Sequence, residues 1–333
     1  MLLEFDSDQR LWRDTIRDVV AKECSPAFIR SVVDEGVDPG PLWKLYNKLG
    51  WTELTDRADA VELAIVLEEL GRSTDPTPYL ATMTHFAPLV PGFQLDGAAG
   101  TAVFSGVNAR RDGSGWILDG TAKHILDGDR ADRIAVVTSA GTFVVRADQV
   151  SATRTQVFDP ALHIAEVSFS GVRADAADRA DVDVSLAMPV ALTGLALTTV
   201  GACQRILDMV LEHVKSRQQF GVQIGSFQAV KHKAADMHVA IERARALSYY
   251  AALTIAAGDD RTCAVAASMA KASAGECQSL VFRHGLQLHG AMGFTWENDL
   301  QFALKRAKSG ELLLGGAAEH RARIFEERHA VDI

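Results

Sequence analysis

The spacing at which apolar residues recur changes twice along this chain, and that double change limits the folds it can adopt. In residues 1–92 they recur at helical spacing, as in VELAIVLEELGR, where the Gly is a typical helix terminator. Residues 93–178 break into short runs rich in Val, Ile, Phe and Thr, such as TAVFSGV and RIAVVTSAGTFVVRAD, which is typical of strands. Helical spacing returns in residues 179–333. This order predicts an α+β chain in which a small antiparallel β domain, expected to close into a barrel, separates two helical domains.

The last region carries the strongest helical pattern. One apolar stripe runs through Leu192, Leu195, Ala196, Thr199, Cys203, Ile206, Leu207, Val210 and Val214. A second helix is predicted over about 227–257, where Gly258 ends it, and a third over about 262–288. Long helices joined by short links favour an up-and-down four-helix bundle.

Composition excludes several classes of partner. The 333 residues carry a formal net charge of −9, with 48% apolar and 23% charged residues, so we do not expect a nucleic acid or an anionic membrane as the main partner. We find no apolar run of the roughly 18 residues that a membrane span needs. The acidic, amphipathic start MLLEFDSDQRLWRD is not a secretion signal.

The cysteines favour a cytoplasmic protein. Cys24, Cys203, Cys263 and Cys277 are scattered and never form CxxC. This spacing predicts reduced, mostly buried thiols rather than disulfides. No cluster of metal-ligand residues is visible, so no metal site is predicted.

Two segments interrupt the helical pattern with residues that have no evident packing role. They are SRQQFGVQIGSFQAVKHKAADM (216–237) and LQLHGAMGFTWENDLQFALKRAK (286–308). Together they resemble paired motifs of the acyl-CoA dehydrogenase family, and VLEELGRSTDPTPYLAT and GWILDGTAKHILDGDRADRIAVV resemble that family's N-terminal and β-domain signatures. The resemblance runs from end to end. It implies an N-terminal helical domain at 1–92, a reduced middle β-barrel domain at 93–178 and a C-terminal four-helix bundle at 179–333.

The resemblance also implies a cofactor site. In that family each FAD lies at a dimer interface, where the bundle of the neighbouring subunit grips its ADP half. The implied contacts are Arg217, Gln287 and Gly290 to the pyrophosphate, Phe220 to the adenosine, and Gln219 and Gln228 along the same groove. A guanidinium is a natural fork for phosphate oxygens, and a Gly lets the backbone approach a phosphate closely.

The same segment has a purely structural interpretation. Arg217 can act as a cation at a helix C-terminus, Phe220 as a core residue and Gly221 as a plain C-cap. The matching segment at 286–308 favours the cofactor interpretation.

Both positions that the family uses for its catalytic base are apolar here. That base is a Glu or Asp held in an apolar pocket. Aligned from Gly290, the C-terminal position falls on Leu314, within GELLLGG. The alternative position, at the start of the first bundle helix, falls on Ala191, followed by Leu192.

Three other residues are candidates for a relocated base. Glu311 and Glu319 lie near Leu314 in the sequence, and His124 lies on a predicted strand. The more ordinary interpretation makes the two acids solvated or capping carboxylates and His124 a structural residue.

The β domain departs from the family as well. The family's Trp-x-Thr-Asn-Gly, which cradles the flavin ring, reads HILDG at 124–128, and its Thr-Glu-x-x-x-Gly-Ser has no counterpart. The residues implied for a neighbour's cofactor are therefore present, whereas those for the chain's own flavin are not.

This asymmetry predicts a non-catalytic subunit of a heteromeric α2β2 acyl-CoA dehydrogenase, similar to those that shorten bulky acyl-CoA side chains, including steroid ones. FAD would be shared with a homologous partner that carries the catalytic Glu and binds most of the acyl-CoA. Electron-transfer flavoprotein would accept the electrons, and the isolated chain would be inactive. One alternative is a self-sufficient homo-oligomeric flavoprotein with a relocated base. Another is a flavin-free scaffold, against which the intact Arg217 set counts.

Overall fold

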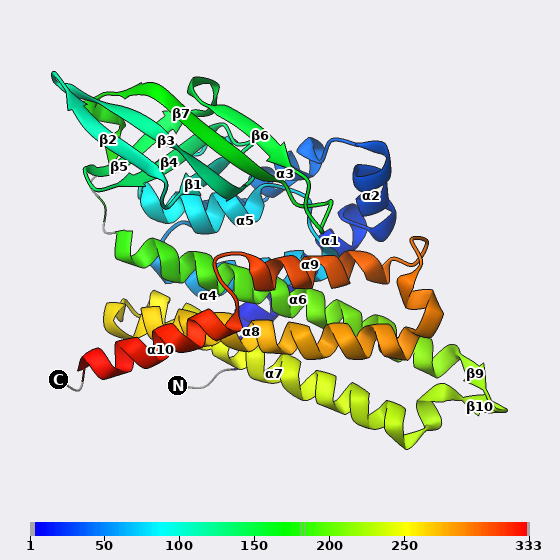
Figure 1. Ribbon diagram of the computed structural model, residues 1–333. Helices are drawn as coiled ribbons and strands as arrows, with labels where there is room; N and C mark the ends of the chain where they lie inside the picture. The colour runs from blue at the N-terminus through cyan, green and yellow to red at the C-terminus, as the bar shows by residue number, and fades with distance from the viewer. Residues whose placement is uncertain (1–3, 181, 183, 332–333) are drawn as a thin grey trace.

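The computed structural model of the protein describes residues 4–180, 182 and 184–331. Helices form the first and last parts of the chain, and two β-sheets lie between them in sequence. In Figure 1 the sheets stand above the long helices, with the short N-terminal helices beside them. This order confirms the α+β architecture, while the boundaries after residues 92 and 178 stay a prediction.

The N-terminal helices share one apolar core. They are α1 Ser7–Glu23, α2 Pro26–Arg30, η1 Ser31–Glu35, α3 Gly40–Lys48, α4 Ala60–Ser73, α5 Tyr79–Ala81 and η4 Thr82–Phe86. Helix α1 begins where it does because the Asp6 carboxylate accepts hydrogen bonds from the backbone N–H groups of Asp8 and Gln9, at 2.9 and 2.8 Å. Helix α4 is buried over most of its length and packs against both α1 and the bundle.

The β domain consists of two four-stranded sheets. Its strands are β1 Gly100–Val103, β2 Val107–Asp112, β3 Gly115–Leu126, β4 Arg133–Thr138, β5 Gly141–Arg146, β6 Ser151–Thr155, β7 Ile164–Ala174 and β8 Arg179–Ala180. The strand orders are β1-β4-β5-β8 and β2-β3-β7-β6, and one apolar core joins residues of both sheets.

The strand pairs of this domain are mainly antiparallel, as predicted, and the domain departs from the prediction in two details. No closed barrel is observed among the described residues, because the strands separate into two sheets. The domain is also not purely antiparallel, since β1 pairs with β4 in parallel. The physical reason is that the β2–β3 hairpin lies in the other sheet. The chain therefore leaves the first sheet after β1 and re-enters it in the same direction at β4.

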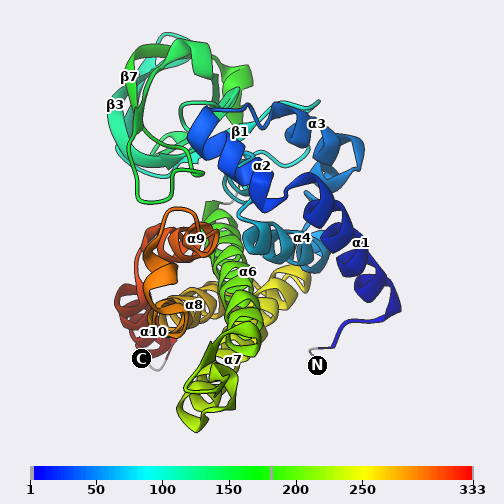
Figure 2. The same cartoon turned by 90° about the vertical axis from the view of Figure 1, so that its right-hand side faces the viewer.

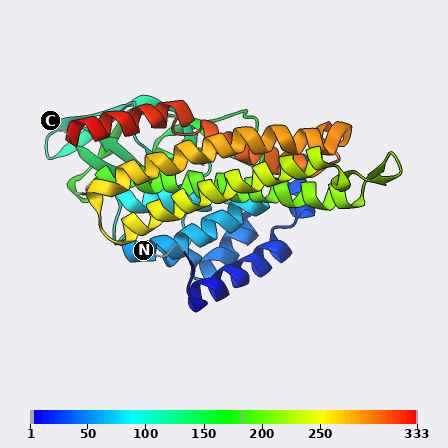
Figure 3. The ribbon, with the colours of Figure 1, turned by 90° about the horizontal axis from the view of Figure 1, so that it is seen from below.

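The C-terminal helices form the predicted bundle. Its members are α6 Ala187–Ser216, α7 Gln228–Ala256, α8 Asp260–His289 and α9 Leu300–Leu312, and α10 Ala317–Val331 lies against α8. A small hairpin, β9 Gln218–Gln219 and β10 Val222–Gln223, joins α6 to α7. Figure 2 looks along the bundle and shows α6 between α4 on one side and α8 and α9 on the other. Figure 3 shows the long helices side by side, with α10 at one edge and α1 at the other.

Helix α6 corrects one statement made from the sequence. It is long and apolar enough, by length and composition, to cross a membrane, so the expectation that no stretch reaches that length was wrong. However, 83% of its apolar window is buried inside the protein. An apolar helical stretch of this length, with neighbours on several sides, is typical of the interior of a large domain, and α6 is contacted by α4, α7, α8 and α9.

Glycines let α4 and α6 approach closely. A Cβ on Gly201 would overlap the backbone of Glu68, and a Cβ on Gly71 would overlap the backbone of Thr198. Since neither helix backbone can yield at these points, the contact between the N-terminal helices and the bundle depends on both glycines.

A buried arginine joins all three parts of the chain. Arg306 on α9 donates from Nε to the Asp159 carboxylate at 2.8 Å and from Nη1 to the carbonyl oxygen of Asp75 at 2.9 Å. The side chains of Arg306 and Asp159 are almost completely inaccessible to solvent. The N-terminal helices, the loop before β7 and the bundle therefore meet at one ion pair.

Candidate functional site

The predicted cofactor residues lie at the end of the bundle farthest from the sheets. Arg217 directly follows α6, and Gln219 and Phe220 lie in the β9–β10 hairpin, whose turn places Phe220 and Gly221 at positive φ. Such a turn suits a two-residue hairpin connection. It leaves the Phe220 ring 92% exposed, so the interpretation of Phe220 as a core residue fails.

A pair of stacked histidines brings the second predicted segment beside the first. The rings of His213, near the end of α6, and His289, at the end of α8, lie 4.8 Å apart and nearly parallel. Burial lowers the pKa of both imidazoles, aided at His213 by Arg217 and opposed at His289 by the hydrogen bond to Gly285. Two neutral rings can stack in this way without charge repulsion. Gln287 and Gly290 therefore lie at the same end of the bundle as Arg217.

The exposed polar groups at this end fit the ADP half of FAD. Within the part of the chain that the structure describes, the side chains of Arg217, Gln228 and Gln287 make no hydrogen bond or ion pair, and all three are exposed. The Gln219 amide bonds only to the neighbouring carbonyl of Gln218, at 2.8 Å. Free donors beside an exposed aromatic ring are what a pyrophosphate and an adenine require.

Apolar side chains surround these donors. Met292 and Phe294, in the turn after α8, are 56% and 76% exposed, and the Phe227 ring contacts the Phe220 ring edge-on at 6.2 Å. An apolar rim of this kind around unpaired donors is typical of a surface that another molecule covers.

A second site lies where the N-terminal helices, the sheets and the end of α9 meet. It is a cavity of about 790 Å³ with walls that are mainly apolar, and its polar lining groups include His85, Lys123, His124 and Ser309. Burial lowers the pKa of His85 to about 4, so that imidazole is neutral at physiological pH.

Leu314 lines this cavity, with its backbone at a φ of 54°. Among the described residues that line it there is no Asp or Glu. Of the two candidate acids, Glu311 bonds to Lys308 Nζ at 2.8 Å and Glu319 to Arg323 at 2.7 Å, and neither lines the cavity. Ala191, the other predicted base position, is fully buried in α6 and does not line it either. His124 does line it, also at a positive φ.

Two buried residues that the sequence analysis missed hold the backbone around Leu314. The Nζ of Lys271, on α8, donates to the carbonyl oxygens of Glu311 and Gly315, and His320 Nε2 donates to the carbonyl of Leu314 at 2.9 Å. Burial lowers the pKa of Lys271 to about 8. A single lysine within a run of small residues, AASMAKASAGE, was the available signal.

The helical domain, the paired sheets and the long-helix bundle, with a cavity where they meet, make up a fold of the helix–sheet–bundle type. The family profile described as "Acyl-CoA dehydrogenase, C-terminal domain" matches residues 188–329. The protein belongs to the acyl-CoA dehydrogenase family, whose members are FAD-dependent.

Individual relatives agree with this assignment. The chain is 30% identical over 330 residues to "Acyl-CoA dehydrogenase IpdE2" of Mycobacterium tuberculosis, covering 96% of this chain and 97% of that one. Its fold is similar to the ChsE4–ChsE5 complex from Mycobacterium tuberculosis, with a TM-score of 0.87, 22% identity and 99% of each chain covered. It is also similar to the Tcur3481–Tcur3483 steroid ACAD, with a TM-score of 0.86, 24% identity and 98% of each chain covered.

Proposed function

We propose that this chain is the base-lacking subunit of a heteromeric, FAD-dependent acyl-CoA dehydrogenase. The observation that carries the proposal is the cavity of about 790 Å³, which has Leu314 at the base position and no carboxylate among its described lining residues. Removal of an α-proton from an acyl thioester needs a base in contact with substrate. A chain without one contributes to catalysis through a partner.

In this proposal the chain contributes by binding the ADP half of the partner subunit's FAD. Arg217, Gln287 and Gly290 hold the pyrophosphate of the partner's FAD, Phe220 packs on the adenosine, and Gln219 and Gln228 line the groove. The support is that these groups are exposed and gathered at one end of the bundle, and that the Arg217, Gln228 and Gln287 side chains are unpaired within the described residues. When bound, FAD supplies the acceptor for the β-hydride.

The partner that this arrangement needs is a homologous subunit with an intact catalytic Glu, in an α2β2 assembly. The ChsE4–ChsE5 complex and the Tcur3481–Tcur3483 steroid ACAD support that arrangement by their similarity in fold. We further propose a bulky acyl-CoA substrate, of the steroid side-chain type, bound mainly by the partner. Electron-transfer flavoprotein is the proposed acceptor and the cytoplasm the proposed location.

A self-sufficient homo-oligomeric flavoprotein is the second candidate. The observation in its favour is that a cavity is retained in this chain and that His124 lines it. Against it, the flavin-cradling residues expected near 124–128 are absent from the sequence.

Flavin content separates these functions. The chain is expressed alone and with a homologous subunit that carries the Glu, and flavin absorbance per chain is measured together with native mass. We expect one FAD per two unlike chains in the complex and almost none in the lone chain. A yellow homotetramer with one FAD per chain would support the second candidate. A colourless complex would make the chain a flavin-free scaffold.

A further inference from the structure

A second cavity, separate from both sites above, lies between α1, α2, α4, α6 and α9. Its volume is about 460 Å³, which falls within the range of about 300–1,000 Å³ typical of small-molecule pockets. Its apolar walls include Val20, Ile29, Met209 and Phe302. None of its lining residues belongs to the cavity that contains Leu314 or to the Arg217 set.

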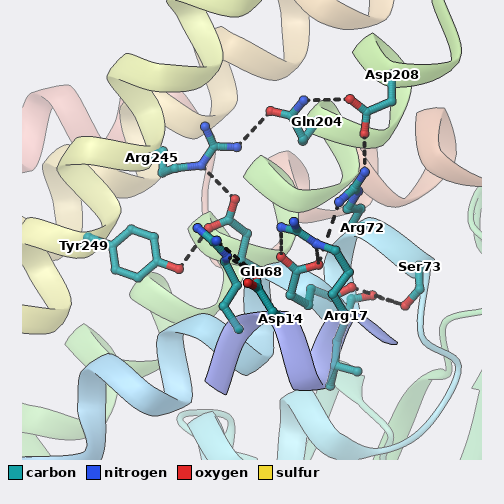
Figure 4. Close-up of polar contacts among 12 residues, drawn as sticks. Asp14, Arg17, Glu68, Arg72, Ser73, Gln204, Asp208, Arg245 and Tyr249 are labelled. Carbon is teal, nitrogen blue, oxygen red and sulfur yellow. Dashed lines mark hydrogen bonds and ion pairs between the residues drawn. The ribbon is translucent and has the colours of Figure 1, made fainter. Parts of the chain in front are cut away.

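Three guanidinium groups from three different helices line this cavity: Arg17 of α1, Arg72 of α4 and Arg205 of α6. Arg17 binds Glu69 through Nε and Nη2, at 3.0 and 2.5 Å. Arg72 binds Asp208 at 2.6 Å, as Figure 4 shows. Arg205 makes no side-chain hydrogen bond or ion pair with any residue that the structure describes.

Most guanidinium donors in the cavity wall make no hydrogen bond among the described residues. A guanidinium carries five N–H donors, and the contacts above use two on Arg17, one on Arg72 and none on Arg205. None of the acidic lining residues is paired with Arg205 in the part of the chain that the structure describes. Glu69 is occupied by Arg17 and lies 4.0 Å from Arg72 Nη1, Asp299 is occupied by Arg30 at 2.6 Å, and the exposed Asp18 makes no ion pair with Arg205.

We propose that this cavity binds an amphipathic oxyanion, which is a carboxylate or phosphate group carried on an apolar body. Arg205 is the ligand of the oxyanion, because its planar fork matches two oxygens of such a group. The apolar body lies against Met209 and Phe302. The site does not depend on the proposed role in FAD binding.

The test uses the full chain in the assembly in which it purifies. Decanoate, decyl phosphate, decan-1-ol, acetate and inorganic phosphate are titrated by calorimetry. We expect decanoate or decyl phosphate to bind at least about tenfold more tightly than decan-1-ol, which has the tail without the charge, and than acetate and inorganic phosphate. The preference between the two long-chain anions identifies the head group. Equal binding of decan-1-ol and both anions would overturn the proposal.

Variants locate the site. Arg205→Met breaks no observed ion pair, so it should retain its melting temperature while losing about tenfold in affinity for the anion. Ala21→Trp places an indole on an exposed lining position and should block binding. It therefore tests the site independently, even if Arg205→Met fails to fold. Asp18→Asn removes a nearby negative charge and should tighten binding.

The matched control is Arg110→Met on β2, which should bind as the wild type does. Unchanged affinity in both Arg205→Met and Ala21→Trp would contradict the assignment.

Discussion

Lys271 donates a hydrogen bond from its buried ammonium to the carbonyl oxygen of Gly315, 2.7 Å away, and a second to the carbonyl of Glu311, at 2.8 Å. His320, which is also buried, donates to the carbonyl of Leu314 between them. The segment that lines the cavity with Leu314 is therefore held from the side of α8 and α10. Its left-handed backbone at Leu314 and Gly315 is kept in place by groups that do not line the cavity.

Lys271 should leave a signature in the pH dependence of stability. Its pKa is lowered by burial to about 8 in the folded protein from 10.5. Between these values the unfolded chain binds more protons than the folded one, so the free energy of unfolding contributed by this group rises with pH. Urea unfolding of the wild type and Lys271→Met, at intervals across that window, measures the difference.

We expect the wild type to gain stability relative to Lys271→Met as the pH increases through the window, with a constant difference below about pH 8. Lys22→Met, at an exposed position on α1, serves as the control and should follow the wild type. Parallel curves for the wild type and Lys271→Met would show that the folded lysine titrates normally.

Replacing only one member of the buried Arg306–Asp159 pair should lower the free energy of unfolding. Arg306→Met leaves the Asp159 carboxylate buried without its cation, so the free energy of unfolding should fall by about 3–5 kcal/mol. The double variant Arg306→Met with Asp159→Leu should cost less than the sum of the single changes. Chemical denaturation of all four proteins completes the cycle, and simple additivity would mean that the pair is not coupled.

Arg217 should matter for flavin rather than for folding. Its side chain makes no contact with another described residue that its removal would break, so Arg217→Ala should retain the melting temperature. Loss of a charge-assisted contact to pyrophosphate, worth roughly 1.5–3 kcal/mol, should weaken FAD binding by the complex about tenfold or more. The exposed Arg173 on β7 provides the control, Arg173→Ala. FAD affinity that is unchanged in Arg217→Ala would remove Arg217 from the site.

Glu311 should not act as the base. Its carboxylate bonds to Lys308 and does not line the cavity, so Glu311→Gln should leave dehydrogenation by the complex near the wild-type rate. Leu314→Ala should do the same. Steady-state turnover measures both. A decrease of several orders of magnitude in Glu311→Gln alone would show that the base had moved to that residue.

The sequence was sufficient to predict the features that depend on local periodicity. Helices α7 and α8 begin and end within a turn of their predicted limits, because Gly258 and the flanking polar residues are local signals. Strand pairing is different. The pattern of TAVFSGV predicts a strand but carries no information on its neighbour, so the parallel pairing of β1 with β4 and the separation into two sheets could not be predicted.

The candidate site also has parts that the local sequence predicts and parts that it does not. Contiguous motifs at 216–237 and 286–308 identified the exposed end of the bundle from sequence alone. The surroundings of Leu314 are assembled from α8, α9 and α10, so the roles of Lys271 and His320 depend on packing between distant segments. The stacking of His213 on His289 also joins two helices and has no local signal.

The glycine contacts between α4 and α6 limit how these two helices can move relative to each other. With Gly71 and Gly201 seated against facing backbone, neither helix can slide along the other without a steric collision. The N-terminal helices and the bundle are therefore fixed against sliding where α4 meets α6. A ligand that enters beside Leu314 therefore does so without sliding along the α4–α6 contact, and the strands of the β domain supply much of the wall of that cavity.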